Sequence, residues 1–198
     1  MSIASNILPG AVFLDRDGTI NQDNGYISHP EDFNVYPFAG EAIKILNDLD
    51  LLVFIVTNQS GIARGFYSFE DLDKIHTKMN QQLAAHSATI DDIFISPYYH
   101  EGNVEPFNVA HIDRKPNLGL FYKAIKKHPF AIKNSFMIGD RYTDIEFGKR
   151  AGLKTFLVLT GDGEKEFLYH RNDWISKPDF IVKDLLAAAK LIKKLLGK

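Results

Sequence analysis

The sequence contains no cysteine and no long apolar run. Without cysteine no disulfide can form, which excludes the small disulfide-stabilised domains that many secreted proteins use. The longest wholly apolar stretch, residues 51–56, is far shorter than the roughly 20 residues that cross a bilayer. Residues 1–10 lack the basic start and the apolar stretch of a secretory signal. These absences predict a cytoplasmic protein that does not span a membrane.

The chain also lacks an excess of either charge. Its 23 basic and 25 acidic residues give a net charge of −2, and no stripe of lysine and arginine marks a nucleic-acid site. The lysines and leucines of residues 190–198 are typical of an amphipathic terminal helix with a solvated face. A hydrophobic content of 45%, with 15 phenylalanines, supports one substantial core. We therefore expect a single monomeric domain over residues 1–198.

Apolar runs and helical patterns alternate along the chain. Short continuous apolar runs indicate strands that are covered on both faces of a parallel sheet. These runs are residues 11–14, 52–56, 92–95, 135–138, 155–159 and 180–182. Helical spacing is present in residues 39–49, 69–85, 120–128, 143–151 and 183–196. The alternation predicts an α/β protein with three α/β/α layers around a doubly wound parallel sheet, whose ligands bind at the carboxyl ends of the strands.

Polar side chains follow the strands at the ends where such ligands bind. Asp15 and Asp17 follow the first strand and flank one residue, an oxygen-rich arrangement that suits Mg²⁺. An Asp-Gly pair alone would equally indicate a surface turn. However, Thr57 follows the second strand, Lys115 follows a long loop, and Asp140 follows the fourth strand along the chain. Four separated motifs in this order favour a catalytic site over a turn.

These motifs resemble those of the haloacid dehalogenase-like (HAD-like) phosphatases. They are Asp15-Arg16-Asp17-Gly18-Thr19, Thr57-Asn58, Lys115, and Gly139 to Asp144. The resemblance implies that Asp15 attacks phosphorus to form an aspartyl-phosphate, and that Asp17 serves first as general acid and then as general base. It also implies that Thr57 and Lys115 bind the phosphoryl oxygens.

The same resemblance implies a metal cofactor. Mg²⁺ would be held by the Asp15 carboxylate, the Asp17 backbone carbonyl and the Asp140 carboxylate. Mn²⁺ remains an alternative, because both ions accept hard oxygen ligands. Asp144 would either orient the metal's waters or only stabilise the first turn of its helix.

A closer resemblance extends to about residue 185. Its blocks are Leu14 to Asn21, Asp23 to Tyr26, Thr57 to Gly65, and Arg114 to Pro116. They are similar to the D-glycero-D-manno-heptose 1,7-bisphosphate phosphatases and to the histidinol-phosphate phosphatases of the same subfamily, which have a minimal cap domain or none. The substrate-binding residues that this resemblance implies are Asp23, Asn24, Gly25, Tyr26, Asn58, Gln59, Ser60, Arg114 and Arg141.

The long irregular stretch of residues 97–117 departs from that subfamily. Many members carry a Cys/His zinc site there, at positions that match Ser96, Tyr98, His111 and Asp113. A structural zinc ion prefers four thiolate or imidazole ligands, and this set offers one imidazole and one carboxylate. We therefore predict that structural zinc is absent, while a site completed by His100 remains an alternative.

Packing of aromatic and aliphatic side chains would then hold the loop in place of a metal. Tyr98, Tyr99, Phe107 and Ile112 are the residues expected to pack it on itself.

The substrate class that these residues favour is a small phosphorylated metabolite. The leading hypothesis is hydrolysis of the C7 phosphate of heptose bisphosphate, with the anomer left open. Histidinol phosphate is the alternative: a cationic ligand prefers an acidic pocket, whereas a bisphosphate prefers Arg114 and Arg141. A third hypothesis, a non-catalytic phosphate-binding or scaffold protein, is disfavoured because Asp15, Asp17 and Lys115 are all retained.

Overall fold

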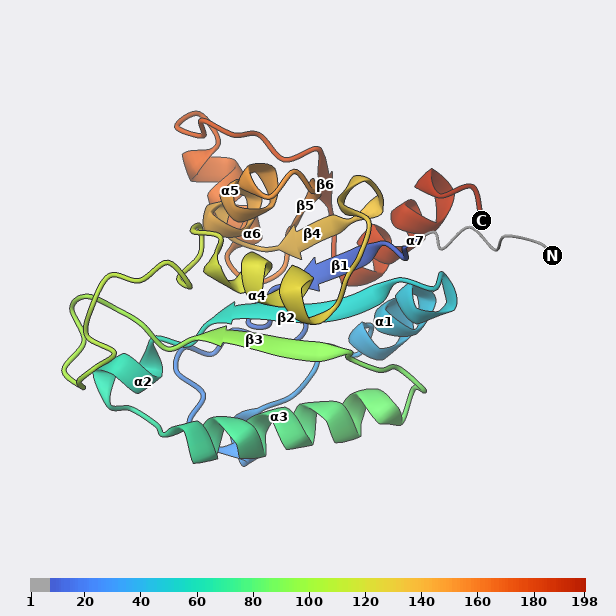
Figure 1. Cartoon of the computed structure of the whole chain (residues 1–198). Helices are drawn as coiled ribbons and strands as arrows, with labels where there is room; N and C mark the ends of the chain where they lie inside the picture. The colour runs from blue at the N-terminus through green and yellow to red at the C-terminus, as the bar shows by residue number, and fades with distance from the viewer. Residues whose placement is uncertain (1–7) are drawn as a thin grey trace.

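The computed structural model describes residues 8–198, so part of the stretch in which no secretory signal was expected lies outside the described residues. Six parallel strands form one sheet in the order β3-β2-β1-β4-β5-β6 (Figure 1). Their bounds are β1 Ala11–Leu14, β2 Leu52–Asn58, β3 Asp92–Ser96, β4 Phe136–Gly139, β5 Lys154–Val158 and β6 Phe180–Val182. The strand order reverses between β1 and β4, which is the point of a doubly wound sheet where ligands bind.

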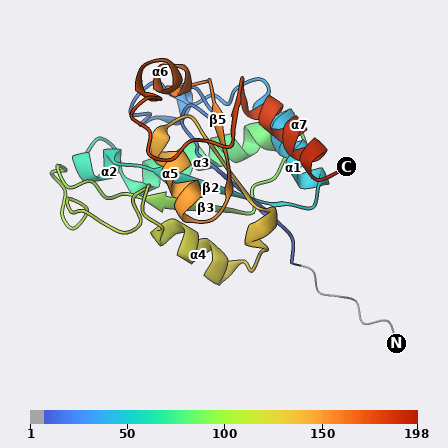
Figure 2. The ribbon, with the colours of Figure 1, turned by 90° about the horizontal axis from the view of Figure 1, so that it is seen from above.

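Helices cover both faces of this sheet. Their bounds are α1 Ala39–Asp48, α2 Gly61–Arg64, α3 Phe69–Ala84, α4 Gly119–Lys127, α5 Tyr142–Arg150, α6 Gly163–Lys165 and α7 Leu185–Leu195. Seen from above, α1, α3 and α7 lie on one side of the sheet, and α4 and α5 lie on the other (Figure 2). One-turn segments at 30–32, 132–134 and 166–170 complete the helical structure of residues 8–198.

Two apolar cores follow from the alternation of side chains along the central strands. Val12 and Leu14 of β1 face α1, α3 and α7, whereas Phe13 faces α4 and α5. The Phe13 ring lies 5.4 Å from Phe54 and 5.5 Å from Phe130, both in edge-to-face contact. Each fully buried phenylalanine contributes roughly 1.5–3 kcal/mol of hydrophobic stabilisation. The two cores hold the carboxyl ends of β1, β2 and β4 in one place.

The predicted elements are confirmed within one to two residues at most boundaries. Ser68 caps α3 in a reciprocal capping box with Asp71, and Gly152 follows α5 with a φ of 74°. The α2 turn and the 163–170 segment were not predicted, because each is shorter than a helical repeat that sequence periodicity detects. No helix within residues 8–198 combines the length and apolar character that a membrane crossing needs.

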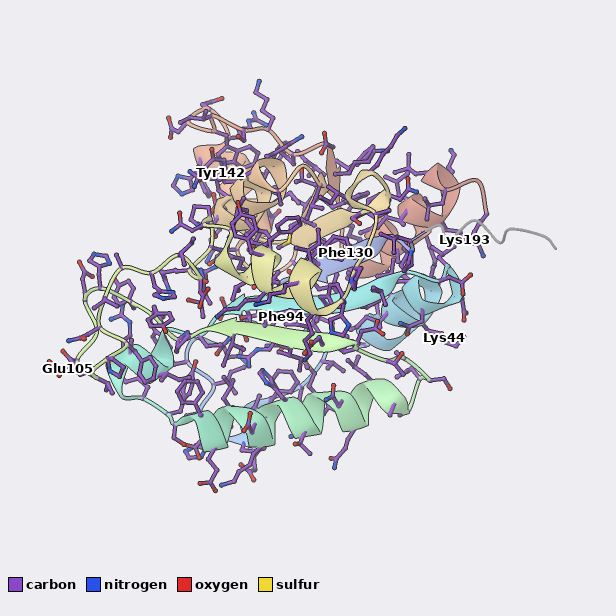
Figure 3. All side chains as sticks on the ribbon, in the orientation of Figure 1. Lys44, Phe94, Glu105, Phe130, Tyr142 and Lys193 are labelled. Atoms are coloured by element: carbon purple, nitrogen blue, oxygen red, sulfur yellow. The ribbon has the colours of Figure 1, made fainter. Side chains whose placement is uncertain are left out.

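The loop of residues 97–117 projects from the carboxyl edge of the sheet. Figure 3 shows Glu105 at its tip, whereas Phe94 and Phe130 lie between the sheet and its helices. This edge also carries the residues that the sequence motifs identified.

Candidate active site

A cavity of about 740 Å³ opens at the carboxyl ends of β1 and β2. Most of the predicted site residues line it, namely Asp15, Asp17, Asp23, Gly25, Tyr26, Thr57, Asn58, Gln59, Ser60, Arg114, Lys115 and Arg141. Two others do not. Asp140 is fully buried beneath the cavity, and Asn24 is exposed beside it, so the predicted contact of Asn24 with substrate stays a prediction.

Three buried carboxylates and one lysine form what we call the acidic cluster: Asp15, Lys115, Asp140 and Asp144. Lys115 Nζ lies 2.7 Å from Asp15 Oδ1 and 2.6 Å from Asp144 Oδ1. The Lys115 ammonium also donates to the Val56 carbonyl at 2.7 Å, so β2 fixes its position. Three carboxylates and one ammonium leave the cluster with two uncompensated negative charges when all are ionised.

This excess negative charge and the burial of the cluster shift the pKa values of its carboxyl groups. Burial raises the pKa of Asp15 to about 7, even though the Lys115 ammonium acts in the opposite direction. Burial and the neighbouring Asp15 and Asp144 carboxylates raise the pKa of Asp140 well above its usual range. A cation placed among these oxygens would lower both pKa values and restore the carboxylate form of the proposed nucleophile.

The donor set fits a hard divalent cation. Oxygens of Asp15, Asp140 and Asp144 lie within 4.8 Å of one another. Asp140 Oδ2 accepts from the Asp162 backbone N–H at 2.8 Å, but the buried Asp140 Oδ1 has no hydrogen-bond partner within residues 8–198. An unpartnered buried carboxylate oxygen is costly unless a ligand satisfies it. This orphan oxygen is the local sign of a metal site.

Gly18 allows the loop after β1 to approach Asp140. Its φ is 81°, and a Cβ at this position would lie 2.1 Å from Asp140 Oδ2. The Gly18 carbonyl accepts a hydrogen bond from Thr160 Oγ1 at 2.6 Å. This hydrogen bond joins the loop after β5 to the loop after β1.

The structure gives Asp144 two contacts that the sequence left open. Its Oδ1 pairs with Lys115, and its Oδ2 accepts from the Arg141 backbone N–H at 3.1 Å, at the start of α5. Asp144 therefore caps its helix and at the same time holds the lysine beside Asp15.

A second buried assembly lies beside the acidic cluster. We call it the Arg16 network, and it consists of Arg16, Asp17, Asn21, Thr57, Gln59, Tyr67 and His76. Arg16 is 1% exposed, and its guanidinium donates to both carboxylate oxygens of Asp17 over 2.9–3.3 Å. Burial alone would raise the pKa of Asp17, but Arg16 and the side-chain donors Asn21 and Gln59 hold it below its usual value. The structure thus favours Asp17 in its carboxylate form.

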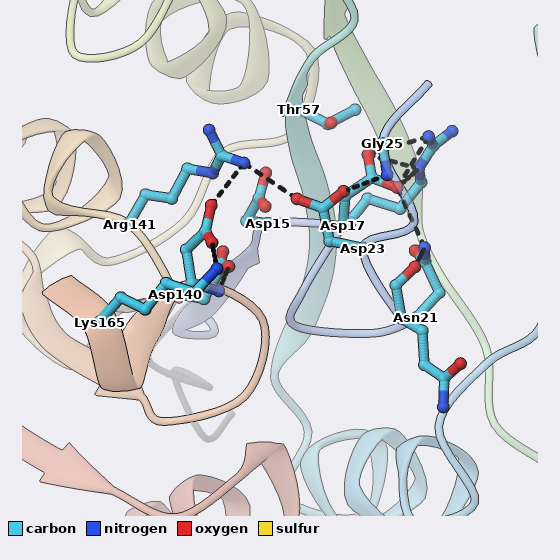
Figure 4. A network of polar contacts seen from close by, with 12 residues as sticks. Asp15, Asp17, Asn21, Asp23, Gly25, Thr57, Asp140, Arg141 and Lys165 are labelled. Atoms are coloured by element: carbon cyan, nitrogen blue, oxygen red, sulfur yellow. Dashed lines mark hydrogen bonds and ion pairs between the residues drawn. The ribbon is translucent and has the colours of Figure 1, made fainter. Parts of the chain in front are cut away.

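Arg141 bridges two carboxylates at one end of the cavity (Figure 4). Its Nη2 lies 2.9 Å from Asp23 Oδ2 and 2.8 Å from Asp162 Oδ2. Two protein carboxylates therefore already pair with the Arg141 charge, while Arg141 lines the cavity and its predicted contact with a bisphosphate stays a prediction.

Arg114 presents the opposite situation. Its Nη1 donates to the Tyr98 carbonyl at 3.1 Å, and its guanidinium lies 5.0 Å from the Tyr99 ring centre. No carboxylate of residues 8–198 forms an ion pair with it. Its charge is held in place by an aromatic ring and a carbonyl, and remains available to an anionic ligand.

The zinc-equivalent positions make other contacts. The His111 ring stacks on Tyr98 at 3.7 Å, and its Nδ1 accepts from the Asp113 backbone N–H at 3.1 Å. The buried Asp113 carboxylate pairs with Lys123 at 2.5 Å. Ile112 is 56% exposed and does not help to pack the loop, contrary to expectation, because its side chain points to solvent. The absence of zinc stays a prediction that elemental analysis of protein purified without added metal would test.

The sequence reading missed the loop that follows β5. Thr160 and Asp162 contact Gly18 and Asp140, and Glu166 lines the cavity. The signal was present, because Thr160-Gly161-Asp162-Gly163 follows a predicted strand in the same manner as the other motifs.

Comparison with known proteins agrees with this geometry. Residues 112–188 match the family model described as "HAD-hyrolase-like". D-glycero-D-manno-heptose-1,7-bisphosphate 7-phosphatase from Thermosynechococcus vestitus is 37% identical over 186 residues, which cover 92% of this chain and 94% of the relative. The chain belongs to the HAD-like phosphatases.

Other relatives of this HAD-like phosphatase confirm the resemblance. D-glycero-beta-D-manno-heptose-1,7-bisphosphate 7-phosphatase from Haemophilus ducreyi is 38% identical over 163 residues, covering 79% of this chain and 89% of the relative. A crystal structure of D,D-heptose 1,7-bisphosphate phosphatase from B. bronchiseptica, complexed with magnesium and phosphate, superposes with a TM-score of 0.81. It is 29% identical and covers 94% of this chain and 99% of that structure. The predicted fold and family are confirmed.

Proposed function

We propose that this HAD-like phosphatase uses Mg²⁺ to hydrolyse the C7 phosphate of D-glycero-D-manno-heptose 1,7-bisphosphate. The observation that carries the reaction is the acidic cluster, in which the Asp140 carboxylate lies close to that of Asp15 and keeps one oxygen, Oδ1, without a partner within residues 8–198. The substrate is supported by the names of relatives that match nearly the whole chain.

Asp15 is placed to act as the nucleophile. Lys115 holds Asp15 Oδ1, and Asp15 Oδ2 accepts no hydrogen bond within residues 8–198. Attack by Oδ2 forms the Asp15 O–P bond and breaks the P–O bond to the sugar, while Asp17 gives its proton to the leaving oxygen. Water then attacks phosphorus and breaks the Asp15 O–P bond, and its proton returns to Asp17. Inorganic phosphate and the restored Asp15 carboxylate are the products.

The two carboxylates have different tasks and different surroundings. The hydrogen bonds to Asp17 suit the carboxylate form, which takes the proton from water in the second step. In the first step Asp17 must be protonated, and substrate anions near it favour uptake of that proton. Thr57 and Lys115 would bind the phosphoryl oxygens.

The metal would be held by the Asp15 and Asp140 carboxylates and the Asp17 carbonyl. Bound there, Mg²⁺ supplies positive charge that offsets the repulsion between the anionic nucleophile and the phosphate.

The two ends of the cavity suggest how a bisphosphate would lie. Arg114 carries no protein carboxylate partner within residues 8–198, so its planar fork would bind the second phosphate. At the other end Arg141 is outnumbered by Asp23, Asp162 and Glu166. That acidic excess is the specific observation that keeps histidinol phosphate, with its ammonium group, as a second candidate. Our proposal further includes a monomeric cytoplasmic enzyme that acts on a small metabolite and not on nucleic acid.

Phosphate release with Mg²⁺ tests the proposal. The substrates are both anomers of heptose 1,7-bisphosphate, fructose 1,6-bisphosphate, histidinol phosphate and an aryl phosphate, and Asp15→Asn is the control. We expect the heptose bisphosphate to lead in kcat/KM by orders of magnitude. A lead by histidinol phosphate would overturn the substrate but leave the reaction intact. Inertness of the wild type towards every compound would support a non-catalytic protein.

A further inference from the structure

Gln59 lines the cavity, yet its amide is used entirely by the protein. The residue is 2% exposed and directly follows β2. Its Nε2 donates to Asp17 Oδ2 at 2.9 Å and to Thr57 Oγ1 at 2.8 Å. Its Oε1 accepts from Tyr67 OH at 2.6 Å and from Arg16 Nη2 at 3.2 Å. Two donor hydrogens and two acceptor positions are all occupied, which leaves the amide nothing to offer a substrate.

Arg16 determines which way the Gln59 amide points. A guanidinium can only donate hydrogen bonds, so the amide group facing Arg16 must be the oxygen. The NH₂ group must then face Asp17 and Thr57. Arg16 itself is fixed by the Asp17 carboxylate and by His76, whose Nε2 lies 3.2 Å from Arg16 Nη1.

The amide in turn determines where the Thr57 hydroxyl hydrogen points. Thr57 Oγ1 accepts from Gln59 Nε2, and within residues 8–198 this hydroxyl donates to no protein acceptor. Thr57 is 1% exposed and lines the cavity above Asp15 (Figure 4). The Gln59 NH₂ group is itself a donor, so the hydrogen of this buried hydroxyl must find an acceptor elsewhere, and the cavity is where a phosphoryl oxygen would lie.

We propose that Gln59 is a positioning residue that acts through Thr57 and Asp17, and that it does not bind substrate. Its NH₂ group directs the Thr57 O–H towards the transferred phosphoryl group and holds Asp17 Oδ2 in place by a hydrogen bond. Arg16 and Tyr67 both donate to the Gln59 amide oxygen and thereby fix the direction in which these hydrogen bonds run. The proposal rests on the proposed roles of Thr57 and Asp17 in phosphoryl transfer.

A double-mutant cycle with inorganic phosphate tests this role. The four proteins are the wild type, Thr57→Ala, Gln59→Glu and the double variant, each titrated with phosphate in Mg²⁺ by calorimetry. The Gln59→Glu side chain keeps the shape of glutamine but presents an acceptor to Thr57, so the hydroxyl would turn inward and donate to it. We expect Thr57→Ala to weaken phosphate binding about tenfold, the value of one hydrogen bond to an anion. Gln59→Glu should weaken it at least as much, since it adds charge repulsion to the lost bond.

The decisive quantity is the coupling between the two changes. Once Thr57 is alanine there is no hydroxyl to redirect, so the double variant should bind phosphate no more weakly than Gln59→Glu alone. Binding losses that multiply independently, or a Gln59→Glu protein within about twofold of the wild type, would overturn the proposal. Gln81→Glu, the same substitution at an exposed position of α3, is the matched control and should leave phosphate affinity unchanged.

Turnover provides the second measurement. With an aryl phosphate, Gln59→Glu should lower kcat more than Thr57→Ala does, because it disturbs Asp17 as well as Thr57. Circular dichroism verifies that each variant is folded, and Gln59→Met replaces Gln59→Glu in the cycle if the charged variant does not fold. Inertness of the wild type would contradict the proposed function. The binding cycle would still decide the role of Gln59, because it measures phosphate affinity and not hydrolysis.

Discussion

Asp15 and Arg16 are neighbours in the sequence but belong to two different buried assemblies. The acidic cluster around Asp15 has three carboxylates and one ammonium, and it leaves Asp140 Oδ1 without a partner among residues 8–198. In the Arg16 network the guanidinium and the Asp17 carboxylate balance each other, and the Gln59 amide is fully bonded. Burying an uncompensated charge is costly, whereas a paired and bonded one is tolerated. The charge of the first assembly is therefore balanced only with a cation, whereas the charges of the second balance within the protein, although Asn21 Oδ1 also lacks a partner among residues 8–198.

Removing the metal should have the largest effect, and it should act on the acidic cluster and not on the Arg16 network. Asp140→Asn, or chelation of Mg²⁺, should lower kcat/KM about 10³-fold or more, because several kcal/mol of charge stabilisation are lost. Asp73→Asn, on the exposed face of α3, should change nothing. Mg²⁺ should raise the Tm of the wild type but not that of Asp140→Asn. A Tm insensitive to Mg²⁺ in both proteins would mean that the acidic cluster holds no cation.

Replacing the lysine of the acidic cluster should lower the free energy of unfolding by nearly as much as any single substitution can. Lys115→Met leaves Asp15 and Asp144 facing each other in a buried site, which should destabilise the metal-free protein by about 3–5 kcal/mol. The loss should be smaller below pH 7, because the pKa of Asp15 is raised to about 7 and its protonation removes one charge. Urea denaturation measures the difference, with the exposed Lys74→Met as control. An equal loss at low and high pH would count against this picture.

The Arg16 network should show itself in the pH dependence of stability. Burial and the Arg16 guanidinium lower the pKa of His76 from 6.5 to about 3, so the folded protein keeps this imidazole neutral. Below about pH 6.5 His76 binds a proton in the unfolded chain but not in the folded one, so its contribution to stability falls as the pH falls. The loss from His76 should reach about 2 kcal/mol by pH 5.

His76→Gln tests that contribution, because its amide oxygen can still accept from Arg16. Asp15, whose raised pKa acts in the opposite direction, is common to both proteins, so on going from about pH 7 to about pH 5 the free energy of unfolding should change about 2 kcal/mol less favourably in the wild type than in His76→Gln. The exposed His170→Gln should behave like the wild type. The same change in the free energy of unfolding in all three proteins would show that His76 is not held neutral.

The smallest effect is expected at the rim of the cavity. Arg114 has no carboxylate partner within residues 8–198, so its charge is unbalanced like that of the acidic cluster. Arg141 is paired with carboxylates, as Arg16 is in its network. Arg114→Lys keeps the charge but loses the planar fork, so KM for a sugar bisphosphate should rise about tenfold, or about 1.4 kcal/mol. KM for an aryl monophosphate should not change. Arg150→Lys, paired with Glu146 on the surface, is the control. A similar rise for both substrates would place Arg114 at the transferred phosphate instead of the second one.

The sequence predicted the strand ends well and the hydrogen bonds poorly. Asp15, Thr57 and Asp140 were found because a parallel sheet brings its carboxyl ends together, so position along the chain implies position in space. The neutralisation of Arg141 was not predictable in this way, because its partner Asp23 is 118 residues away on an irregular loop. The direction of the Gln59 amide likewise depends on Arg16 and Tyr67, which only the folded backbone brings to it.

The central claim is that Asp15 becomes phosphorylated during turnover. The most direct measurement is to quench the enzyme with borohydride while it hydrolyses heptose bisphosphate in Mg²⁺, and then to map the digested protein by mass spectrometry. Reduction converts an aspartyl-phosphate to homoserine, so we predict homoserine in place of Asp15 in the turning-over wild type and none without substrate. Rapid hydrolysis with no modified Asp15, or modification of a different carboxylate, would contradict the account.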